Sequence, residues 1–370
     1  MKVCGIVCEY NPLHQGHLYH IKKARELSKC DILIACMSGN FVQRGEFAIV
    51  DKWTRTKAAL ENGVDLVLEL PFVFACQSAE NFGKNAVRIL ALALCDSICF
   101  GSETNNLEEL KEIASMSYKI DNFKENMKKG YSYPYCYGFM ADSYGPNDIL
   151  AISYLRELAN YPNITPISIK RTSDYNDDQL NDNYSSAKAI RKAIMNNQDV
   201  SKDCLIANIN TYPKVNWDNN YGIVRNLLLT LKPQQLQEIF LMDEGIENHL
   251  AKTAYYNYDY DSFIKNAVTR RYTRSRIQRT LCQLLVNNTK KDMADLPAYD
   301  TIRVLGFNQI GKSYLRELQS KSIKVANHYS ANIKQYRDVE FKAAIAYSSQ
   351  MSSKDKQYIT RSEISGLNLK

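Results

Sequence analysis

Short apolar runs alternate with amphipathic stretches along the first 200 residues of the chain. The apolar runs end in polar or glycine-containing loops, as buried strands do. They predict strands over Val3–Cys8, Asp31–Met37, Val64–Leu70, Ser97–Phe100 and Ile164–Lys170. Apolar residues recur at helical spacing after Gly16 and over Lys52–Asn62, Ser78–Leu92, Asn147–Ala159 and Ser185–Asn196. Strands that alternate with helices indicate βαβ units, so we expect an α/β fold with a parallel sheet.

The pattern changes beyond about residue 200. Helical spacing replaces the alternation over Tyr221–Leu231, Pro233–Phe240, Gly245–Lys252, Asp259–Val268 and Ser275–Val286. Asn, Asp and Pro cluster between residues 195 and 215, as they do in linkers. A chain of 370 residues is long enough for two domains. We therefore predict an α/β catalytic domain over residues 1–200 and a mainly helical, basic domain over residues 201–370.

The composition is that of a globular protein, with 45% hydrophobic and 24% charged residues. No apolar run reaches the roughly 18 to 20 residues that cross a bilayer. Glu9 and Asn11 interrupt the apolar start before a signal peptide could form, so we expect a cytoplasmic protein with no membrane contact. The ten cysteines lack CxxC spacing, which favours small buried hydrophobic residues over a zinc site.

The net charge of +7 is unevenly distributed along the chain. Residues 261–370 contain 20 Lys and Arg against 9 Asp and Glu, whereas the first 260 residues have a net charge of −4. A basic third beside a mildly acidic remainder suggests an anionic partner, most simply a nucleic acid. A solvated basic face that keeps the protein soluble explains the charge equally well.

The first candidate site is the segment Glu9–His17, with the sequence EYNPLHQGH. It lies where a predicted strand ends and a helix begins, a junction at which α/β folds bind ligands and helix N–H groups bind phosphate. Gly16 would let the backbone approach a nucleotide, and His14 and His17 would flank its phosphates as charge develops. The alternatives are incidental surface histidines or a metal pair, for which Glu9 is the only obvious further ligand nearby.

A second candidate element is Ser185–Arg191, with the sequence SSAKAIR. Ser185 and Ser186 would cap a helix, and Lys188 and Arg191 follow within its first turns. Hydroxyls, free N–H groups and two cations at one helix end can bind a triphosphate. An ordinary N-cap with a solvated basic face is the alternative.

The two elements together resemble the HIGH-type nucleotidyltransferase superfamily, whose catalytic domain is Rossmann-like. Longer segments are similar to the bacterial tRNA(Met) cytidine acetate ligase family. They are Val7–Ile21, Met37–Lys57, Gly63–Pro71, Phe100–Glu103, Gly145–Leu150, Ile169–Arg171, Arg271–Arg279 and Ile302–Asn308. The resemblance therefore spans nearly the whole chain.

The resemblance implies a ligase that joins acetate to N4 of the wobble cytidine of elongator tRNA(Met). ATP would activate acetate as acetyl-adenylate with release of pyrophosphate, and AMP would leave on transfer. Mg²⁺ is expected with ATP on general grounds, without a nameable protein ligand. The implied ATP-binding residues are Val7, Cys8, Glu9, Tyr10, Asn11, Pro12, Leu13, His14, Gln15, Gly16, His17, Leu18, Tyr19, His20, Gly101, Asn147 and Arg171. The serine-capped helix start would add Ser185, Ser186 and Arg191 to this ATP site.

The segment Ser38–Glu46 has the composition of an active-site loop, with two glycines, amide donors and the cation Arg44. It could hold acetate or the cytidine, with Arg44 as a catalytic residue beside His14 and His17, because adenylate chemistry needs mainly positioning and charge neutralisation. Lys52 and Arg55 follow on a helix and face either the site or solvent.

The basic part contains arginines interleaved with a tyrosine between residues 270 and 279. Such a segment suits an RNA backbone and an unstacked base, the base stacking on Tyr272. A solvated basic helix face is the alternative. The arginines predicted to bind RNA are Arg270, Arg271, Arg274 and Arg279.

Two other functions are compatible with these motifs. A small-molecule adenylyltransferase of the same superfamily would share the N-terminal site but leave the basic region unexplained. A non-catalytic RNA-binding protein would not need both histidines and the serine-capped helix. The sequence does not indicate how one tRNA is selected, which group accepts the amine proton, or the oligomeric state.

Overall fold

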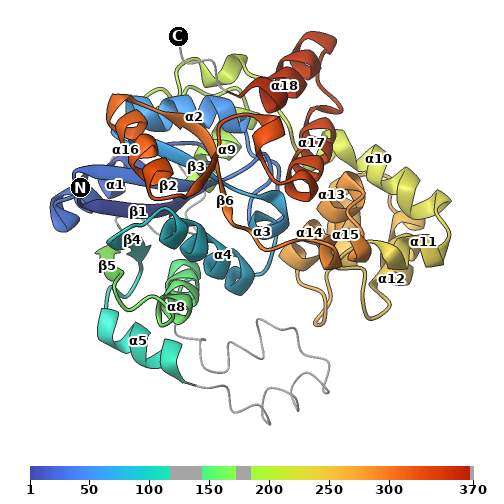
Figure 1. Cartoon of the computed structure of the whole chain (residues 1–370). Coiled ribbons are helices and arrows are strands. Elements are labelled where there is room, and N and C mark those ends of the chain that lie inside the picture. The colour runs from blue at the N-terminus through green and yellow to red at the C-terminus, as the bar shows by residue number, and fades with distance from the viewer. Residues whose placement is uncertain (117–143, 172–184, 367–370) are drawn as a thin grey trace.

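The computed structural model describes residues 1–116, 144–171 and 185–366. At its centre lies a seven-stranded sheet with the order β5-β4-β1-β2-β3-β6-β7 (Figure 1). The strands are β1 (Val3–Cys8), β2 (Ile32–Ser38), β3 (Leu66–Leu70), β4 (Ser97–Ser102), β5 (Thr165–Lys170), β6 (Thr301–Phe307) and β7 (Lys324–Ala326). Strands β1 to β5 are parallel to one another. Strand β6 runs antiparallel to its neighbour β3, and β7 is parallel to β6. The five strands predicted from apolar runs are confirmed, with ends shifted by one or two residues.

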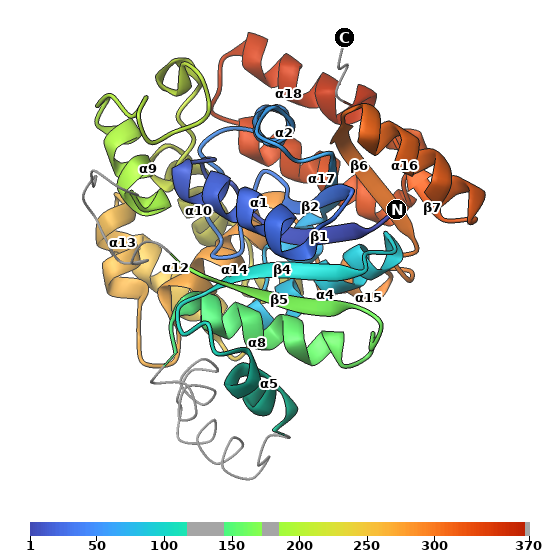
Figure 2. The ribbon, with the colours of Figure 1, turned by 90° about the vertical axis from the view of Figure 1, so that its left-hand side faces the viewer.

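Helices cover both faces of the sheet, because its strands are apolar on both sides. One core joins the strands to α4 (Ala79–Leu92), α8 (Pro146–Leu158) and α16 (Gln309–Ser320). The other core joins them to α1 (Gln15–Ser28), α2 (Lys52–Glu61) and α9 (Ala187–Met195). Figure 2 shows α1 on one side of β1, β4 and β5 and α8 on the other. The short helix α5 (Leu107–Ser115) packs against α8.

A helical part lies to one side of the sheet (Figure 1). Its helices are α10 (Trp217–Thr230), α11 (Pro233–Glu238), α12 (Ile246–Tyr256), α13 (Tyr260–Ala267), α14 (Arg274–Val286) and α15 (Lys290–Ala294). They share a hydrophobic core with α17 (Lys334–Ser348), the short helix α3 (Phe72–Ala75) and one residue of α18 (Ser353–Ser365). The helical spacing beyond residue 200 therefore predicted real helices.

The C-terminal third is mainly helical but also contributes two strands to the sheet. The chain returns to the sheet through β6, α16 and β7 over residues 301–326. The edge of β3 is otherwise unpaired, and the apolar run Thr301–Phe307 satisfies its backbone groups. The helical part is thus an excursion between residues 217 and 294, followed by a return to the sheet.

One loop of the α/β part is embedded in the helical core. Phe41 and Phe47 pair across the loop as an isolated bridge and pack in the core of the helical part. Phe47 contacts Trp217 edge to face with ring centroids 4.9 Å apart. The Trp217 indole N–H donates to the carbonyl of Gly45 over 3.0 Å. This loop therefore joins the two parts at the carboxyl end of β2.

The expectation for the cysteines agrees with the structure. The nine cysteines in the described ranges are all free, and eight of them are buried. Within those ranges, no helix has both the length and the apolar character that a membrane span requires.

Candidate active site

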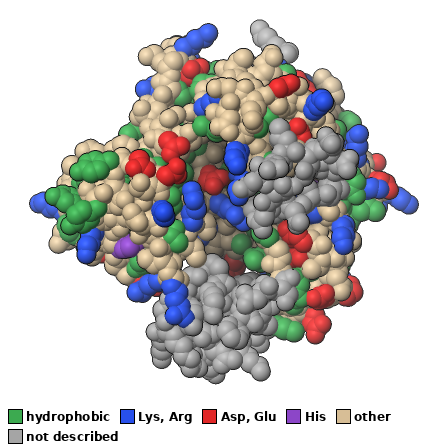
Figure 3. Space-filling view, turned by 180° about the vertical axis from the view of Figure 1, so that it is seen from behind, with side chains coloured by type: hydrophobic (Ala, Val, Ile, Leu, Met, Phe, Trp, Pro, Cys, Tyr) green, Lys and Arg blue, Asp and Glu red, His purple; other side chains and the backbone are tan. Residues whose placement is uncertain are grey.

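A cavity of about 920 Å³ opens at the carboxyl ends of the parallel strands, between the sheet and the helical part. Its walls come from the loop after β1, the start of α1, the ends of β4 and β5, the starts of α8 and α9, the loop at 42–46 and the first turns of α14. Figure 3 shows Lys, Arg and acidic side chains beside a hollow on this face of the molecule. Segments more than 250 residues apart in sequence therefore share one pocket.

The two histidines form a reciprocal cap at the start of α1. His14 is the N-cap residue, and its Nδ1 accepts the backbone N–H of Gly16 over 3.1 Å. The Nδ1 of His17 accepts the backbone N–H of His14 over 3.3 Å. Since both Nδ1 atoms accept hydrogen bonds, each neutral ring has its proton on Nε2. Both rings line the pocket with centroids 3.8 Å apart, so the histidine pair forms part of its wall.

The pocket holds these histidines neutral. Burial, with Arg171 and Arg191 nearby, lowers the pKa of His14 to about 3. Burial and the neighbouring His14 lower the pKa of His17 well below its ordinary value. An anion bound at the rings would oppose this effect, since it favours the charged imidazolium. Neutral Nε2–H groups are suited to donate to phosphate oxygens.

The role of Gly16 and the metal-pair alternative for this segment can now be judged. Cβ at Gly16 would lie 2.9 Å from Cε1 of His14, so the glycine leaves room for that ring. In the described part of the chain, no three His, Cys, Asp or Glu side chains form a cluster that could hold a metal ion. The metal-pair hypothesis therefore lacks further ligands among these residues.

The opposite wall contains Gly101, Asn147 and Arg171. The carboxylate of Glu103 accepts both the backbone N–H and the side-chain amide of Asn147, over 3.2 and 2.6 Å. Arg171 Nη1 donates to Asn147 Oδ1 over 3.3 Å. Gly101 lies within β4, where an added Cβ would contact the side chain of Arg171 at 3.4 Å. Gly101 is therefore not a turn glycine, and Asn147 lies inside α8 rather than at its N-cap.

Sequence reasoning missed the residues that position this wall. Asp148 accepts hydrogen bonds from the hydroxyl of Ser102 and from the backbone N–H groups of Glu103 and Thr104. Glu103 in return accepts the backbone N–H of Asp148 over 2.8 Å. This exchange joins the end of β4 to the start of α8. An acidic residue in the first turn of a helix was the only signal for it in the sequence.

The start of α9 forms a third wall. Ser186 is the N-cap residue, and its hydroxyl accepts the backbone N–H of Ala189 over 3.0 Å. Arg191 donates to the carbonyl of Asn11 over 2.8 Å and lies 3.5 Å from the carboxylate of Glu46. Ser186, Lys188 and Arg191 all line the pocket. The structure therefore brings the second candidate element to the first.

Most residues that the resemblance assigned to ATP line this pocket. They are Val7, Cys8, Glu9, Tyr10, Asn11, His14, Gly16, His17, Tyr19, His20, Gly101, Asn147, Arg171, Ser186 and Arg191. Pro12, Leu13, Gln15, Leu18 and Ser185 do not line it. Leu13 is fully buried in the core beneath α1, and the side-chain amide of Gln15 donates to the carbonyl of Lys202.

Arg44 lines the pocket from the loop after β2, as does Glu46. Glu9 faces the same space, and its Oε1 accepts the backbone N–H of Gln43 over 2.7 Å. Burial raises the pKa of Glu9, although the Gln43 N–H and Arg191 oppose that rise. A carboxylate with a raised pKa therefore lines the pocket and contacts the loop that contains Arg44.

Lys52 and Arg55 face neither the pocket nor solvent, which overturns both expectations for them. They are 1% and 0% exposed. The Arg55 guanidinium donates to the carbonyls of Glu9, Ser38 and Gly39, so it supports the loops that border the pocket.

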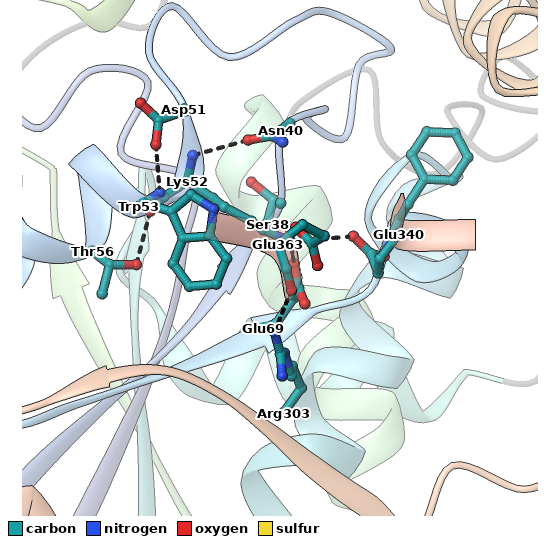
Figure 4. A network of polar contacts seen from close by, with 12 residues as sticks. Ser38, Asn40, Asp51, Lys52, Trp53, Thr56, Glu69, Arg303, Glu340 and Glu363 are labelled. Atoms are coloured by element: carbon teal, nitrogen blue, oxygen red, sulfur yellow. Dashed lines mark hydrogen bonds and ion pairs between the residues drawn. The ribbon is translucent and has the colours of Figure 1, made fainter. Parts of the chain in front are cut away.

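Lys52 is the centre of a buried ion cluster (Figure 4). Its ammonium pairs with Glu69 of β3, with Glu363 of α18 at 2.6 Å and with Glu340 of α17 at 3.7 Å. Burial lowers the pKa of Lys52, but these carboxylates reverse the effect and raise it overall. Arg303 of β6 donates to the backbone carbonyl of Glu363 over 3.2 Å. The cluster therefore joins the sheet to the two C-terminal helices.

The arginines predicted to bind RNA separate into two groups. Arg270, Arg271 and Arg274 are exposed outside the pocket, and the helix begins only at Arg274. Arg279 lines the pocket instead, together with Arg276.

Tyr272 does not have the position that the sequence suggested for stacking on a base. It is only 7% exposed, and its hydroxyl donates to the carbonyl of Glu244 over 2.8 Å. Arg276 also pairs with Glu244 at 3.2 Å. Tyr272 therefore packs within the helical part.

Comparisons with known proteins agree with this geometry. A model of the HIGH nucleotidyl transferase family matches residues 1–362. A tRNA(Met) cytidine acetate ligase of Acetivibrio thermocellus is 38% identical over 362 residues, which cover 87% of this chain and 86% of the relative. The ligase of that name from Oceanobacillus iheyensis is 33% identical, with 99% of each chain covered. The chain belongs to the tRNA(Met) cytidine acetate ligase family.

Solved structures of this ligase family have the same fold. The apo crystal structure of Thermotoga maritima TmcAL matches with a TM-score of 0.86 and 31% identity, and 96% of each chain is covered. A second crystal form of that protein, bound with alpha-thio ATP, matches with a TM-score of 0.83. The α/β HIGH nucleotidyltransferase fold is therefore confirmed.

Proposed function

We propose that this protein is a tRNA(Met) cytidine acetate ligase that uses ATP to join acetate to N4 of the wobble cytidine of elongator tRNA(Met). The observation that carries the proposal is the composition of the pocket. One wall offers two neutral imidazole N–H donors at a helix N-terminus, and another comes from the helical, basic part of the chain. A relative of the same fold was crystallised with an ATP analogue, which supports ATP as the nucleotide.

The reaction has two steps. An acetate oxygen attacks the α-phosphorus, the bond to the bridging oxygen breaks, and pyrophosphate leaves with that electron pair. The cytidine N4 then attacks the acetyl carbonyl carbon, AMP leaves, and the nitrogen loses a proton. His14 and His17 donate Nε2–H groups to the phosphate oxygens as charge shifts to pyrophosphate. Gly101, Asn147 and Arg171 hold the nucleoside end, and Arg44 neutralises anionic charge across the pocket.

Mg²⁺ stays a prediction from the chemistry of ATP. The ion prefers octahedral oxygen coordination and usually keeps several waters while it binds phosphates. The described residues contain no cluster of three acidic, His or Cys side chains for it. The side chains of the pocket therefore account for the charge stabilisation in the proposed reaction.

The direct test is to incubate the protein with ATP, labelled acetate and bulk tRNA, then digest the tRNA and look for labelled N4-acetylcytidine. Acetate-dependent exchange of pyrophosphate into ATP reports the first step without tRNA. Exchange without label in tRNA would contradict the ligase and favour a small-molecule adenylyltransferase. No exchange with tRNA affinity intact would favour a non-catalytic RNA-binding protein.

His17 offers a sharper version of this test. His17→Asn keeps an acceptor near the Nδ1 position, which preserves the cap on His14, but removes the Nε2–H donor. His17→Gln keeps a donor near Nε2. We expect His17→Asn to slow exchange by about 100- to 1,000-fold, as loss of one transition-state donor does, and His17→Gln to slow it less. Equal losses in both variants would contradict the donor role.

The exposed arginines should behave in the opposite way. Replacing Arg271 and Arg274 together by Gln is expected to weaken tRNA binding and leave exchange unchanged, because neither residue lines the pocket. If each contacts one phosphate, the slope of log affinity against log salt falls by roughly 0.7 to 0.9 per residue. An unchanged slope would remove both residues from the RNA-binding surface.

A further inference from the structure

Arg279 is a cation in the pocket without a protein anion. It extends from α14 of the helical part and lines the same cavity as His14 and His17. Among the described residues, its guanidinium has no hydrogen-bond or ion-pair partner. The contrast with its neighbours is clear, since Arg276 pairs with Glu244 and Arg191 lies beside Glu46.

The surroundings make this charge costly. Burial, together with the cations Arg276 and Arg44, lowers the pKa of Arg279 to about 10, although the thiols of Cys76 and Cys282 oppose that shift. A guanidinium withdrawn from water without hydrogen bonds or a counter-charge destabilises the fold. An anion in the cavity would remove that cost.

The backbone position of Arg279 is set by the loop after β2. Gly45 has a φ of +75°, and a Cβ there would lie 2.3 Å from the backbone nitrogen of Arg279. Glu46, the next residue, lies 3.5 Å from Arg191, which in turn donates to the carbonyl of Asn11. Arg279 is therefore connected through direct contacts to the segment that contains His14.

We propose that Arg279 binds the carboxylate of the acyl substrate in the adenylation step. This inference rests on the proposed function, under which the substrate is acetate. The planar guanidinium fork matches a carboxylate with two parallel hydrogen bonds. Under the proposed function the phosphates have other donors in the same pocket: the two imidazoles, the start of α1 and Arg191. Arg279 thus brings the helical part into the acetate-activation step.

The proposal is tested by acetate-dependent ATP–pyrophosphate exchange without tRNA. Arg279→Gln is expected to raise the KM for acetate by about 10- to 100-fold, the effect of losing hydrogen bonds to a charged group, with the KM for ATP unchanged. Arg279→Lys, which keeps the charge but not the fork, should lie between wild type and Arg279→Gln. Lys252→Gln is the matched control, because it removes an exposed cation of α12 that lies outside the pocket. Thermal melting of each variant establishes that it is folded.

Each other outcome overturns the assignment. A raised KM for ATP or pyrophosphate instead of acetate would place Arg279 at the phosphates. Unchanged exchange with weaker tRNA binding would place it at the RNA, as the sequence first suggested. Unchanged kinetics in both variants would remove Arg279 from ligand binding. Failure of the proposed function is recognised separately in the wild-type protein, which would then show either no acetate-dependent exchange or exchange without labelled N4-acetylcytidine in tRNA.

Discussion

Lys52 and Arg279 both lie near the junction of the sheet and the helical part, but Lys52 is buried, whereas Arg279 is partly exposed to the pocket. Lys52 is enclosed by Glu69, Glu340 and Glu363, and it does not line the pocket that Arg279 lines. Arg279 faces a large pocket, and within the described part of the chain its guanidinium forms no ion pair with a carboxylate. Both sites carry a desolvation cost, which partners offset at Lys52 alone.

The difference separates a structural charge from a charge available to a ligand. Glu69 comes from the sheet, whereas Glu340 and Glu363 come from the last two helices, so Lys52 holds distant parts of the chain together (Figure 4). The cluster also lies against Gly39, where an added Cβ would be 3.3 Å from Glu69 and 3.4 Å from Glu340. The stable cluster thus supports the loop that leads to Arg44 and Gly45.

The largest expected effect is on stability. Lys52→Met leaves three carboxylates buried without their cation, and breaking a buried ion pair costs about 3 to 5 kcal/mol. Denaturant unfolding followed by circular dichroism measures the change. Lys57→Met on the same helix is the matched control, because its pair with Glu61 is exposed and contributes at most about 0.5 kcal/mol. A loss as small as that of the control would contradict a structural role for the cluster.

Gly45→Ala should affect both stability and the Arg279 end of the pocket. The added methyl meets the backbone of Arg279 at a positive φ, so we expect a loss of about 1 to 3 kcal/mol and a raised KM for acetate. Gly222→Ala in α10, where a Cβ meets no atom within 4 Å, should instead stabilise the protein by about 0.5 to 1 kcal/mol. Equal effects at the two glycines would show that Gly45 does not position Arg279.

A further expected effect is on the pH dependence of stability. Burial and the neighbouring Glu69 raise the pKa of Glu340 well above its ordinary value of 4.5, despite Lys52. The folded state then binds a proton that the unfolded state releases, so stability falls as the pH rises above about 4.5, by at most about 1.4 kcal/mol per pH unit.

Glu340→Gln removes this titration and keeps an acceptor for the backbone N–H of Phe72. The variant should therefore lose less stability than wild type between pH 5 and 8, as measured by urea unfolding at each pH. Parallel curves for the two proteins would mean that Glu340 is ionised in the folded state throughout that range.

Local pattern was sufficient for much of the fold and part of the site. Short apolar runs determined five strands, and parallel strands place their carboxyl ends along one edge, so the segments after β1, β4 and β5 had to meet. The cap formed by His14 and His17 is also local, because N-cap and N3 residues of one helix are always neighbours. Strand β6 was missed because the helical pattern before it suggested that the region was uniform.

The sequence by itself therefore determined the sheet, the helix starts and the histidine pair, all of which depend on short-range spacing. Only the tertiary structure decided between charged residues with the same local pattern. Lys52 is buried because α17 and α18 bring carboxylates to it from some 300 residues away. Arg279 lies in the pocket while Arg271 and Arg274 lie outside it, because Gly45 packs against one turn of α14. Contacts between residues distant in sequence determine whether a charged side chain is buried and which partners it has. The burial and the partners together determine the role of each charge.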